Sequence, residues 1–515
     1  MIWAHISVKD MKAVSIQRAS CLVLAAVLLS WPALFNGYPL LYPDSTDYLA
    51  NGAPVVRAIF LHHFADYYGI RCPLYSLGIF PAHWNLTLWP VVFLNGLLTA
   101  YVLWLLVRLL LPRHTLTNYL CLVVLLSFLT TVGWFVGFVM PDILGPLLYL
   151  SFYLIVFFWE ALARVERFAL MLLAGWAITS HATHLLIAGA LSLVLIAVLV
   201  LQREPVRRWL RPAGSVAMVI AAAVLAQFAL NGYLHGQPSL NGERPPFLLA
   251  RVIADGPGRW YLQQRCSSLH FAVCDRVRDL PDNTDDFLWT AGGVWPTSSV
   301  AQQQQILKEE MPIVLGVLRA YPRDELIISA RHLWEQLGAF ELAGFDATPW
   351  VEQTIEAAVP GSEARYRQSR EAQGTLHEEF FTDIESWTVK ASLVVICVWL
   401  VFIRKGRSRQ LIGLAAVIAF VVIANAAVTG ILSNIEDRYQ ARVIWMVPLF
   451  AALFVLTWFD HRRSTTLELT LSQSETTSVP PAHSAIPQCT STPGSTAQSQ
   501  STEQKPTNRT ERTER

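Results

Sequence analysis

Ten apolar runs, each close to the length of a bilayer crossing, constrain this chain more than any other feature. A helix that crosses the hydrocarbon layer needs roughly 20 apolar residues. The 515-residue chain is 53% hydrophobic and only 15% charged, whereas a soluble domain carries about 25% charged residues. We therefore predict an all-α polytopic membrane protein with about ten transmembrane helices. The runs lie near residues 20–37, 88–111, 117–139, 143–161, 167–181, 184–202, 214–231, 388–403, 411–432 and 441–459.

The distribution of Lys and Arg supports this helix count, because short cytoplasmic loops collect basic residues. Basic clusters at 203–211 and 404–409 follow the sixth and eighth runs, and Arg462 follows the tenth. The short loops at Met140–Asp142 and Ser180–Thr183, which would face the other side, contain no Lys or Arg. The pattern predicts a multi-pass protein of the cell inner (cytoplasmic) membrane with both termini in the cytoplasm.

Composition divides the chain into four parts. The predicted N-terminal membrane module spans residues 1–231 with seven helices, and the predicted C-terminal membrane helices span 388–460. Between them, residues 232–387 are numerous enough to form a periplasmic domain. Residues 461–515 are rich in Ser, Thr, Gln and Pro and cannot bury enough apolar surface to fold. They predict a disordered cytoplasmic tail.

Both long outer segments carry helical patterns. In the first outer loop, residues 38–87, the stretches Val55–Phe64 and Pro73–Phe80 are typical of short helices lying on the membrane surface. In the periplasmic segment, Gln302–Leu318 and Pro322–Leu337 repeat apolar residues with helical spacing. We predict a mostly α outer-face domain.

Two cysteines lie close together in the polar periplasmic segment. Cys266 and Cys274 would face an oxidising compartment, where a disulfide is favoured. Spacing does not fix the connectivity, and Cys72, which is also on the outer side, could compete for a partner. A zinc site is the weaker interpretation, since neither His nor a second Cys pair stands at ligand spacing. We assign no metal ligands.

Ionisable residues cluster in four loops that this topology places on the outer face. A charge at the end of a membrane helix is costly unless it is solvated, paired or used in function. We therefore predict a functional site on this face, with Asp44 as its leading residue. The clustered residues are Asp44, Asp47, Asp142, His181, His184, Glu436, Asp437, Arg438 and Arg442.

These residues also have purely structural interpretations. Asp142 is well placed to cap the helix that follows it, and Asp47 could be a surface or capping carboxylate. Arg438 and Arg442 could anchor the last helix at the lipid headgroups. The two histidines of the fifth-to-sixth loop lie three residues apart and share a helix face. That spacing can bind metal, but two His alone are a weak signal, and hydrogen bonding at a water-filled cavity is the favoured interpretation.

The first outer loop resembles that of the GT-C glycosyltransferases, which include the protein O-mannosyltransferases and the lipid A aminoarabinose transferases. The resemblance is carried by Tyr42-x-Asp44-Ser45-x-x-Tyr48 and by Arg71-Cys72-Pro73-Leu74-Tyr75. Asp437-Arg438-Tyr439, ahead of a last helix containing Pro448, is similar to a frequent C-terminal feature of the family. The chain departs from the family pattern where Ser45 replaces a second acid and Cys72 replaces Pro.

The resemblance implies a membrane glycosyltransferase that uses a polyprenyl-phosphate-sugar donor. The acceptor would be a hydroxyl group of a glycan, lipid or protein at the outer face. Asp44 would act as general base, and Asp142 would share the acceptor site or orient a cation. The remaining residues that the resemblance places around the substrates are Asp47, Arg71, Tyr75, His181, His184, Arg438 and Arg442. Ser45 weakens a paired-carboxylate site, so a divalent cation stays open and no other cofactor is implied.

Two other functions fit the same chain. A transporter or flippase usually needs polar residues near mid-bilayer and often repeated halves, and the sequence shows few of the former and no clear repeat. A non-catalytic assembly protein for envelope polysaccharide would use the periplasmic segment for binding, and Asp44 would be dispensable.

The net charge of +1 gives no reason to expect nucleic acid as a partner. Membrane lipids are the partners that the composition requires.

Overall fold

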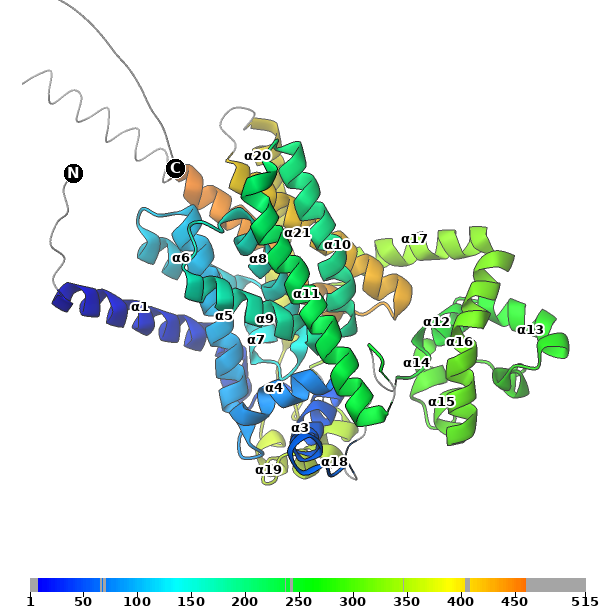
Figure 1. The fold of residues 1–515 in the computed structure, drawn as a ribbon. Coiled ribbons are helices and arrows are strands. Elements are labelled where there is room, and N and C mark those ends of the chain that lie inside the picture. The colour runs from blue at the N-terminus through cyan, green and yellow to red at the C-terminus, as the bar shows by residue number, and fades with distance from the viewer. Residues whose placement is uncertain are drawn as a thin grey trace, which may run out of the picture. The chain divides into compact units, whose positions relative to one another are not determined.

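The computed structural model describes residues 8–64, 67, 71–236, 238–240, 244–345, 347–402 and 408–459, and these residues are helical or in connecting loops (Figure 1). The one isolated β-bridge among them joins Leu40 to Phe138. The predicted tail, residues 461–515, lies outside the described residues. The predicted all-α class agrees with this architecture.

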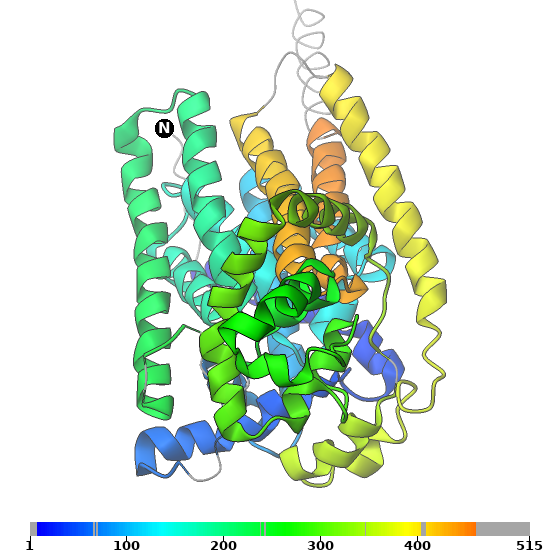
Figure 2. The same cartoon turned by 90° about the vertical axis from the view of Figure 1, so that its right-hand side faces the viewer.

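Within the described part of the chain, six helices are long and apolar enough to cross a membrane. This number is smaller than the ten crossings predicted from the sequence. The chain is nevertheless an α-helical, polytopic membrane protein by the length and composition of these helices. They are α5 (Trp89–Leu110), α10 (Ala182–Leu201), α11 (Val206–His235), α20 (Glu378–Phe402), α21 (Arg409–Leu432) and the span Asp437–Phe459, which begins with α22 (Asp437–Ile444). Figure 2 shows α11 and α20 on opposite flanks of the bundle.

The other four apolar runs form helices whose apolar parts are shorter; that of α1, for example, is limited to Ile16–Leu29. The first run breaks after Leu29, and its second part ends at Gly37, whose φ of 84° favours glycine. The third run breaks at Thr130, which has an extended backbone and donates its hydroxyl to the Leu126 carbonyl. These shorter helices are α1 (Val8–Leu29) with α2 (Trp31–Asn36), α6 (Thr115–Leu129) with α7 (Val132–Gly137), α8 (Leu144–Phe157) after the turn η1 (Pro141–Ile143), and α9 (Arg164–Ser180).

The α8 helix forms the centre of the bundle. Every residue from Leu144 to Val156 is buried, as expected for a helix that is apolar on all sides. It packs against α5, α9, α10, α11 and α21. A helix surrounded by protein on all sides need not match the thickness of the lipid layer, which explains why this run can be short.

The long segments between spans gather at one end of the bundle, which we call the loop side. There α3 (Pro43–Leu61) lies across the end of the bundle (Figure 2), packed against α4 (Pro73–His83) and α18 (Pro349–Ala358). The sequence predicted a helix only from Val55, but α3 begins at Pro43. Proline suits the first helical position. The Tyr42 N–H donates to the Ser45 hydroxyl at 3.0 Å, and this hydrogen bond stabilises the N-terminus of the helix.

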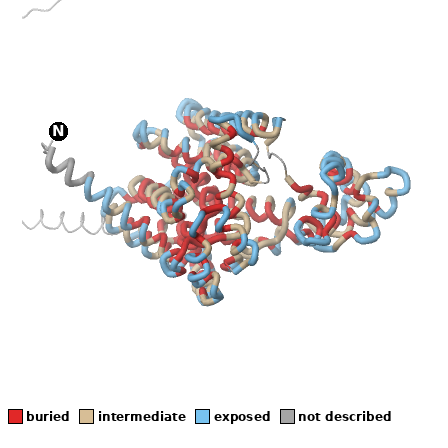
Figure 3. Tube along the Cα trace, turned by 90° about the horizontal axis from the view of Figure 1, so that it is seen from below, coloured by how far each residue is buried: buried red, intermediate tan, exposed pale blue. Residues whose placement is uncertain are grey.

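The segment 232–387 contributes to two hydrophobic cores, which Figure 3 shows as separate regions of buried chain. One group of helices has its own core around Phe287, Ile313 and Val317. A later part, with α18 and α19 (Glu363–Tyr366), packs into the core of the bundle through Val359 and Tyr366. The first group comprises α12 (Phe247–Ala254), α13 (Pro257–Leu269), η2 (Ala272–Arg276), α14 (Thr284–Leu288), α15 (Val294–Thr297) and α16 (Val300–Ala320), followed by α17 (Pro322–Gly338).

A disulfide joins the end of α13 to η2. It links Cys266 to Cys274, with a Cα–Cα distance of 5.5 Å. Cys72, the competing thiol considered from the sequence, is free and partly buried at the start of α4. The cross-link therefore closes a local loop in the α12–α16 group.

Candidate functional site

Two acids and one arginine form a charged group at the start of α3. Asp44 lies in the first turn of the helix, and Asp47 lies three residues later on the same face. Arg71, just before α4, pairs directly with Asp44 and places its Nε 3.6 Å from an Asp47 oxygen. Each of these three side chains is 19% exposed. The group therefore lies at the protein surface and remains accessible to solvent.

The surroundings of Asp47 favour its protonated form. Partial burial raises the pKa of the Asp47 carboxyl above its usual value, and Asp44 adds to the effect while Arg71 opposes it. For Arg71, burial lowers the pKa, but Asp44, Tyr48 and Asp47 together more than offset that loss and the pKa is raised overall. The Asp47 carboxyl, with its raised pKa, thus lies beside the Arg71 guanidinium.

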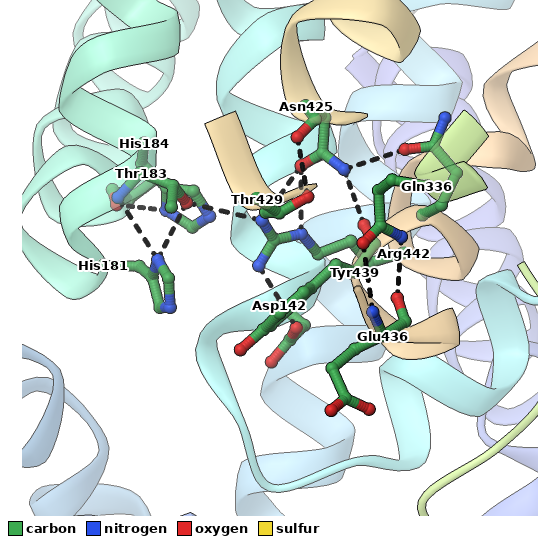
Figure 4. Close-up of polar contacts among 12 residues, drawn as sticks. Asp142, His181, Thr183, His184, Gln336, Asn425, Thr429, Glu436, Tyr439 and Arg442 are labelled. Atoms are coloured by element: carbon green, nitrogen blue, oxygen red, sulfur yellow. Dashed lines mark hydrogen bonds and ion pairs between the residues drawn. The ribbon is translucent and has the colours of Figure 1, made fainter. Parts of the chain in front are cut away.

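A second group surrounds Arg442 on α22 (Figure 4). Its Nη2 donates to the Asn425 side-chain oxygen at 2.9 Å and to the Thr183 hydroxyl at 3.3 Å. Its Nη1 lies 3.4 Å from an Asp142 oxygen, and Arg442 and Asp142 are only 1% and 3% exposed. The sequence left Asp142 open between a helix cap and a functional acid. In the structure its carboxylate contributes to a buried ion pair with Arg442, whose contacts connect η1, α10, α21 and α22.

The two histidines lie beside this group. His181 separates α9 from α10, and its Nδ1 lies 2.8 Å from the Thr183 hydroxyl. His184 is fully buried, and its Nδ1 donates to the Ala177 carbonyl at 2.8 Å. Hydrogen bonding therefore occupies one nitrogen of each ring. Among the described residues, no three His, Cys, Asp or Glu side chains converge in a way that could hold a metal ion.

Arg438 stacks on tyrosine rings between the two groups. Its guanidinium carbon lies 3.9 Å from the centre of the Tyr42 ring and 5.2 Å from that of Tyr439. The side chain is 92% buried, and its Nη1 has no hydrogen-bond partner among the described atoms. Burial raises the pKa of Tyr42 to about 12, although the charge of Arg438 opposes this. Arg438 is thus a buried cation with no ion pair in the described part of the chain.

Tyr48 and Tyr75 connect the two charged groups. Their rings pack edge to face at 4.8 Å, and Tyr75 also stacks on Trp176 of α9. Burial, above all, raises the pKa of Tyr48 well above its usual value, and the charges of Asp44 and Asp142 both contribute. Both carboxylates therefore lie within electrostatic reach of one hydroxyl group. Tyr75 acts as the packing residue that holds α4 against α9.

A small cavity lies beside Arg71. It is lined by Cys72, Thr179, Gln227 and Asn231 together with apolar residues, and has a volume of about 10 Å³. That volume suits about one water molecule.

Sequence reasoning missed Glu371, which positions the segment leading to Asp44. The Leu41 N–H and the Asn36 amide both donate to the Glu371 carboxyl at 3.3 Å, and the Glu371 N–H donates to the Asn36 oxygen at 2.8 Å. Burial raises the pKa of Glu371 well above its usual value. These partners are more than 300 residues apart in the sequence, so no local motif could have indicated the contact.

The structure thus brings all of the predicted site residues to the loop side, in two neighbouring groups with Arg438 between them. Asp44, Asp47 and Arg71 form one group, and Asp142, His181, His184 and Arg442 form the other, with Tyr75 packed alongside. The chain matches no family model, no curated protein and no solved structure. The class defined so far is an α-helical polytopic membrane protein, and any narrower function depends on the geometry of this site.

Proposed function

We propose that the protein is a membrane glycosyltransferase of the GT-C type. It would move a sugar from a polyprenyl-phosphate donor to an acceptor hydroxyl on the outer face of the cytoplasmic membrane. The observation that carries this proposal is Arg438, a buried cation that stacks on Tyr42, has an unbonded Nη1 and forms no ion pair within 4.0 Å among the described residues, although the charges of Asp142 and Asp44 act on it from farther away. Tyr42 is two residues from Asp44, so an available positive charge and a candidate base share one site.

The donor phosphate is the anion that suits this arrangement. A guanidinium group binds phosphate oxygens through two parallel N–H bonds. Arg438 can use its unbonded Nη1 for such a contact, and Arg71 lies on the exposed side of the same site. Fixed positive charges aimed at a leaving phosphate stabilise the charge that develops there in the transition state.

Asp44 is the proposed general base. It would accept the proton of the acceptor hydroxyl while the acceptor oxygen bonds to the anomeric carbon of the sugar. The bond between that carbon and the phosphate oxygen would break, and its electron pair would leave with the polyprenyl phosphate. A carboxylate paired with a guanidinium is a weak base. Binding of the donor phosphate must therefore draw Arg71 away from Asp44 before proton transfer.

The buried Asp142–Arg442 pair supports the site indirectly. Arg442 lies one helical turn after Arg438 on α22, so the bonds from Arg442 to Asp142, Asn425 and Thr183 fix the position of Arg438. Asp142 and Arg442 are positioning residues in this mechanism. A divalent cation at Asp44 and Asp47 would have to displace Arg71 from both carboxylates.

The test is complementation of a deletion strain followed by mass spectrometry of its lipid-linked sugars. We expect the strain to accumulate a polyprenyl-phosphate sugar, and the wild-type gene to remove it. Asp44→Asn should fail to remove it while inserting normally into the membrane. Asp282→Asn, an exposed acid of the α12–α16 group, is the matched control and should complement fully.

Asp47→Asn separates two assignments of the base. Full loss with Asp47→Asn and retained transfer with Asp44→Asn would move the role to Asp47, whose pKa is raised. Normal transfer by both variants would refute a carboxylate base at this site.

A buried ion pair inside a bundle is also typical of transporters. If the donor sugar is found only on the cytoplasmic side of deletion-strain vesicles, the protein is a flippase and the transferase proposal is wrong.

A further inference from the structure

The α17 helix buries polar side chains and exposes large apolar ones, which is the opposite of an ordinary surface helix. Its buried positions are polar: Glu325, His332 and Gln336. Three of its exposed side chains are instead large and apolar: Leu326, Ile327 and Trp334 are 71%, 57% and 77% exposed. A soluble domain rarely leaves such a contiguous apolar stripe open to water, so this face requires an occupant.

Ion pairs and hydrogen bonds occupy the buried polar face. Arg251 of α12 contacts His332 and donates to the Gly430 carbonyl of α21 at 3.2 Å. The Gln336 side chain accepts from the Glu436 N–H at 3.0 Å and donates to the Glu436 carbonyl at 2.8 Å. These contacts fix the rotation of α17 about its axis, so the apolar stripe must point away from the bundle.

The same contacts fix the depth of α17 relative to the bilayer. The α21 helix has 24 residues and is therefore about 36 Å long, against a hydrocarbon layer of about 30 Å. Its final turn consequently lies at the edge of the hydrocarbon. Gly430 is in that turn, and Glu436 lies just before the next span. Figure 1 shows α17 extending from this level of the bundle towards the α12–α16 group.

A third face of α17 provides an internal comparison. With about 100° between successive residues, Asp324, Arg331 and Glu335 fall together on a polar face, and all three are exposed. The centre of this face is about 100° around the helix axis from the centre of the apolar stripe, and Ile327 lies at the border between the two faces. Arg323, which is also exposed, falls at the first turn of the apolar stripe. The preceding helix, α16, also exposes apolar side chains, those of Met311, Leu315 and Leu318.

We propose that the exposed apolar stripe of α17 docks into the bilayer surface on the loop side, at the boundary between headgroups and acyl chains. Amphipathic helices with Trp and Leu on one face bind at this boundary, and Trp prefers it. Lipid is the occupant because close packing against Gly430 of α21 and the hydrogen bonds between Gln336 and the Glu436 backbone hold α17 at that depth. The contact anchors the α12–α16 group to the membrane beside the candidate site. The inference depends on the membrane spans and not on the glycosyltransferase proposal.

Spin-label accessibility in lipid nanodiscs tests the proposal. The parent variant lacks the non-disulfide cysteines Cys21, Cys72, Cys121, Cys397 and Cys489 and keeps the Cys266–Cys274 bridge. Single cysteines then carry a nitroxide at Leu326, Ile327 or Trp334, with matched controls at Asp324, Arg331 or Glu335 on the same helix. Leu225, an exposed residue of the α11 span, provides the lipid-facing reference. Collision rates are measured with oxygen, which concentrates in lipid, and with a water-soluble nickel chelate.

We expect the oxygen-to-nickel ratio at Leu326, Ile327 and Trp334 to be several-fold higher than at the three controls and to approach that at Leu225. Equal ratios on the two faces would overturn the proposal. So would dipolar broadening between labels that appears only with two protein copies per disc, since a second copy would then cover the stripe. Each labelled variant must unfold at the temperature of the parent variant, and the three apolar positions report independently of one another.

Discussion

At the scale of single residues, the most informative side chain is Arg438. Its guanidinium is held by the faces of Tyr42 and Tyr439, and Arg442 takes the nearby carboxylate of Asp142. Stacking on an aromatic ring holds a cation in place and leaves its edge available for hydrogen bonds. This division of roles between two arginines one turn apart gives the site a cation that can accept an incoming anion.

Arg438→Lys should therefore impair sugar transfer although it keeps the charge, because an ammonium group can neither stack in the same way nor bind phosphate with two parallel bonds. We expect a loss of at least tenfold in transfer rate, equivalent to about 1.4 kcal/mol. The matched control is Arg370→Lys, since Arg370 also stacks on an aromatic ring, that of Phe35 at 4.4 Å. Equal activity of the two variants would argue against a phosphate contact at Arg438.

Glu325 makes a separate prediction about pH. Burial raises its pKa to about 7, and the nearby Asp255 adds to the effect. In the unfolded chain the carboxyl has its usual lower pKa, so the stabilisation is fully present in acid and is lost as the pH rises through 7. His332, with a pKa lowered by burial to about 4, acts in the opposite direction, so wild-type pH dependence alone is ambiguous.

Glu325→Gln isolates the contribution of Glu325. The difference in unfolding temperature between Glu325→Gln and the wild type should increase between pH 5 and pH 8, with the variant more stable at the higher pH. The expected change in the free energy of unfolding is on the order of 2 kcal/mol. Detergent-solubilised protein followed by thermal unfolding across this range provides the measurement. A temperature difference independent of pH would show that Glu325 titrates normally.

At the scale of helices, the contact of α17 with α21 depends on a glycine. A Cβ atom at Gly430 would lie 2.9 Å from the His332 carbonyl oxygen and 3.0 Å from the Gln336 Cβ. Both neighbours belong to the helix that carries the exposed apolar stripe. The close approach lets backbone and polar groups of α17 contact the end of a membrane span directly.

Gly430→Ala should separate these helices and lower the free energy of unfolding by about 1–3 kcal/mol, the usual cost of overpacking. The control is Gly214→Ala in α11, where nothing lies within 4 Å of the added Cβ. That variant should be neutral or slightly stabilising, because Ala favours a helix over Gly. The measurement is the unfolding temperature of both variants in one detergent. An unfolding temperature of Gly430→Ala equal to that of the wild type would contradict the close packing.

At the scale of the whole molecule, the sequence predicted the helical class and the clustering of site residues more successfully than the number of spans. Hydropathy alone treats each apolar run as a lipid-crossing helix, but α8 is buried in protein along its length. The break at Thr130 depends on local backbone geometry. The pairing of Asp142 with Arg442 and the contact of Glu371 with Asn36 are long-range contacts, which no local pattern encodes.

The disulfide makes the orientation of the molecule testable. In a variant that keeps only Cys266 and Cys274, an impermeant maleimide added to intact cells should label the protein after mild reduction and not before. This result follows if the α12–α16 group is outside the cytoplasmic membrane. Labelling that requires cell lysis would place the loop side in the cytoplasm and reverse the predicted topology. Labelling without reductant would contradict the bridge.

The contact between Asn36 and Glu371 also has a consequence for biogenesis. Because synthesis proceeds from the N-terminus, the Asn36–Leu41 segment emerges from the ribosome long before Glu371 exists. A nascent chain that stops short of this glutamate can insert its early helices yet leave the segment before Asp44 without its final support. The Asp44 loop would therefore reach its final conformation only late in translation.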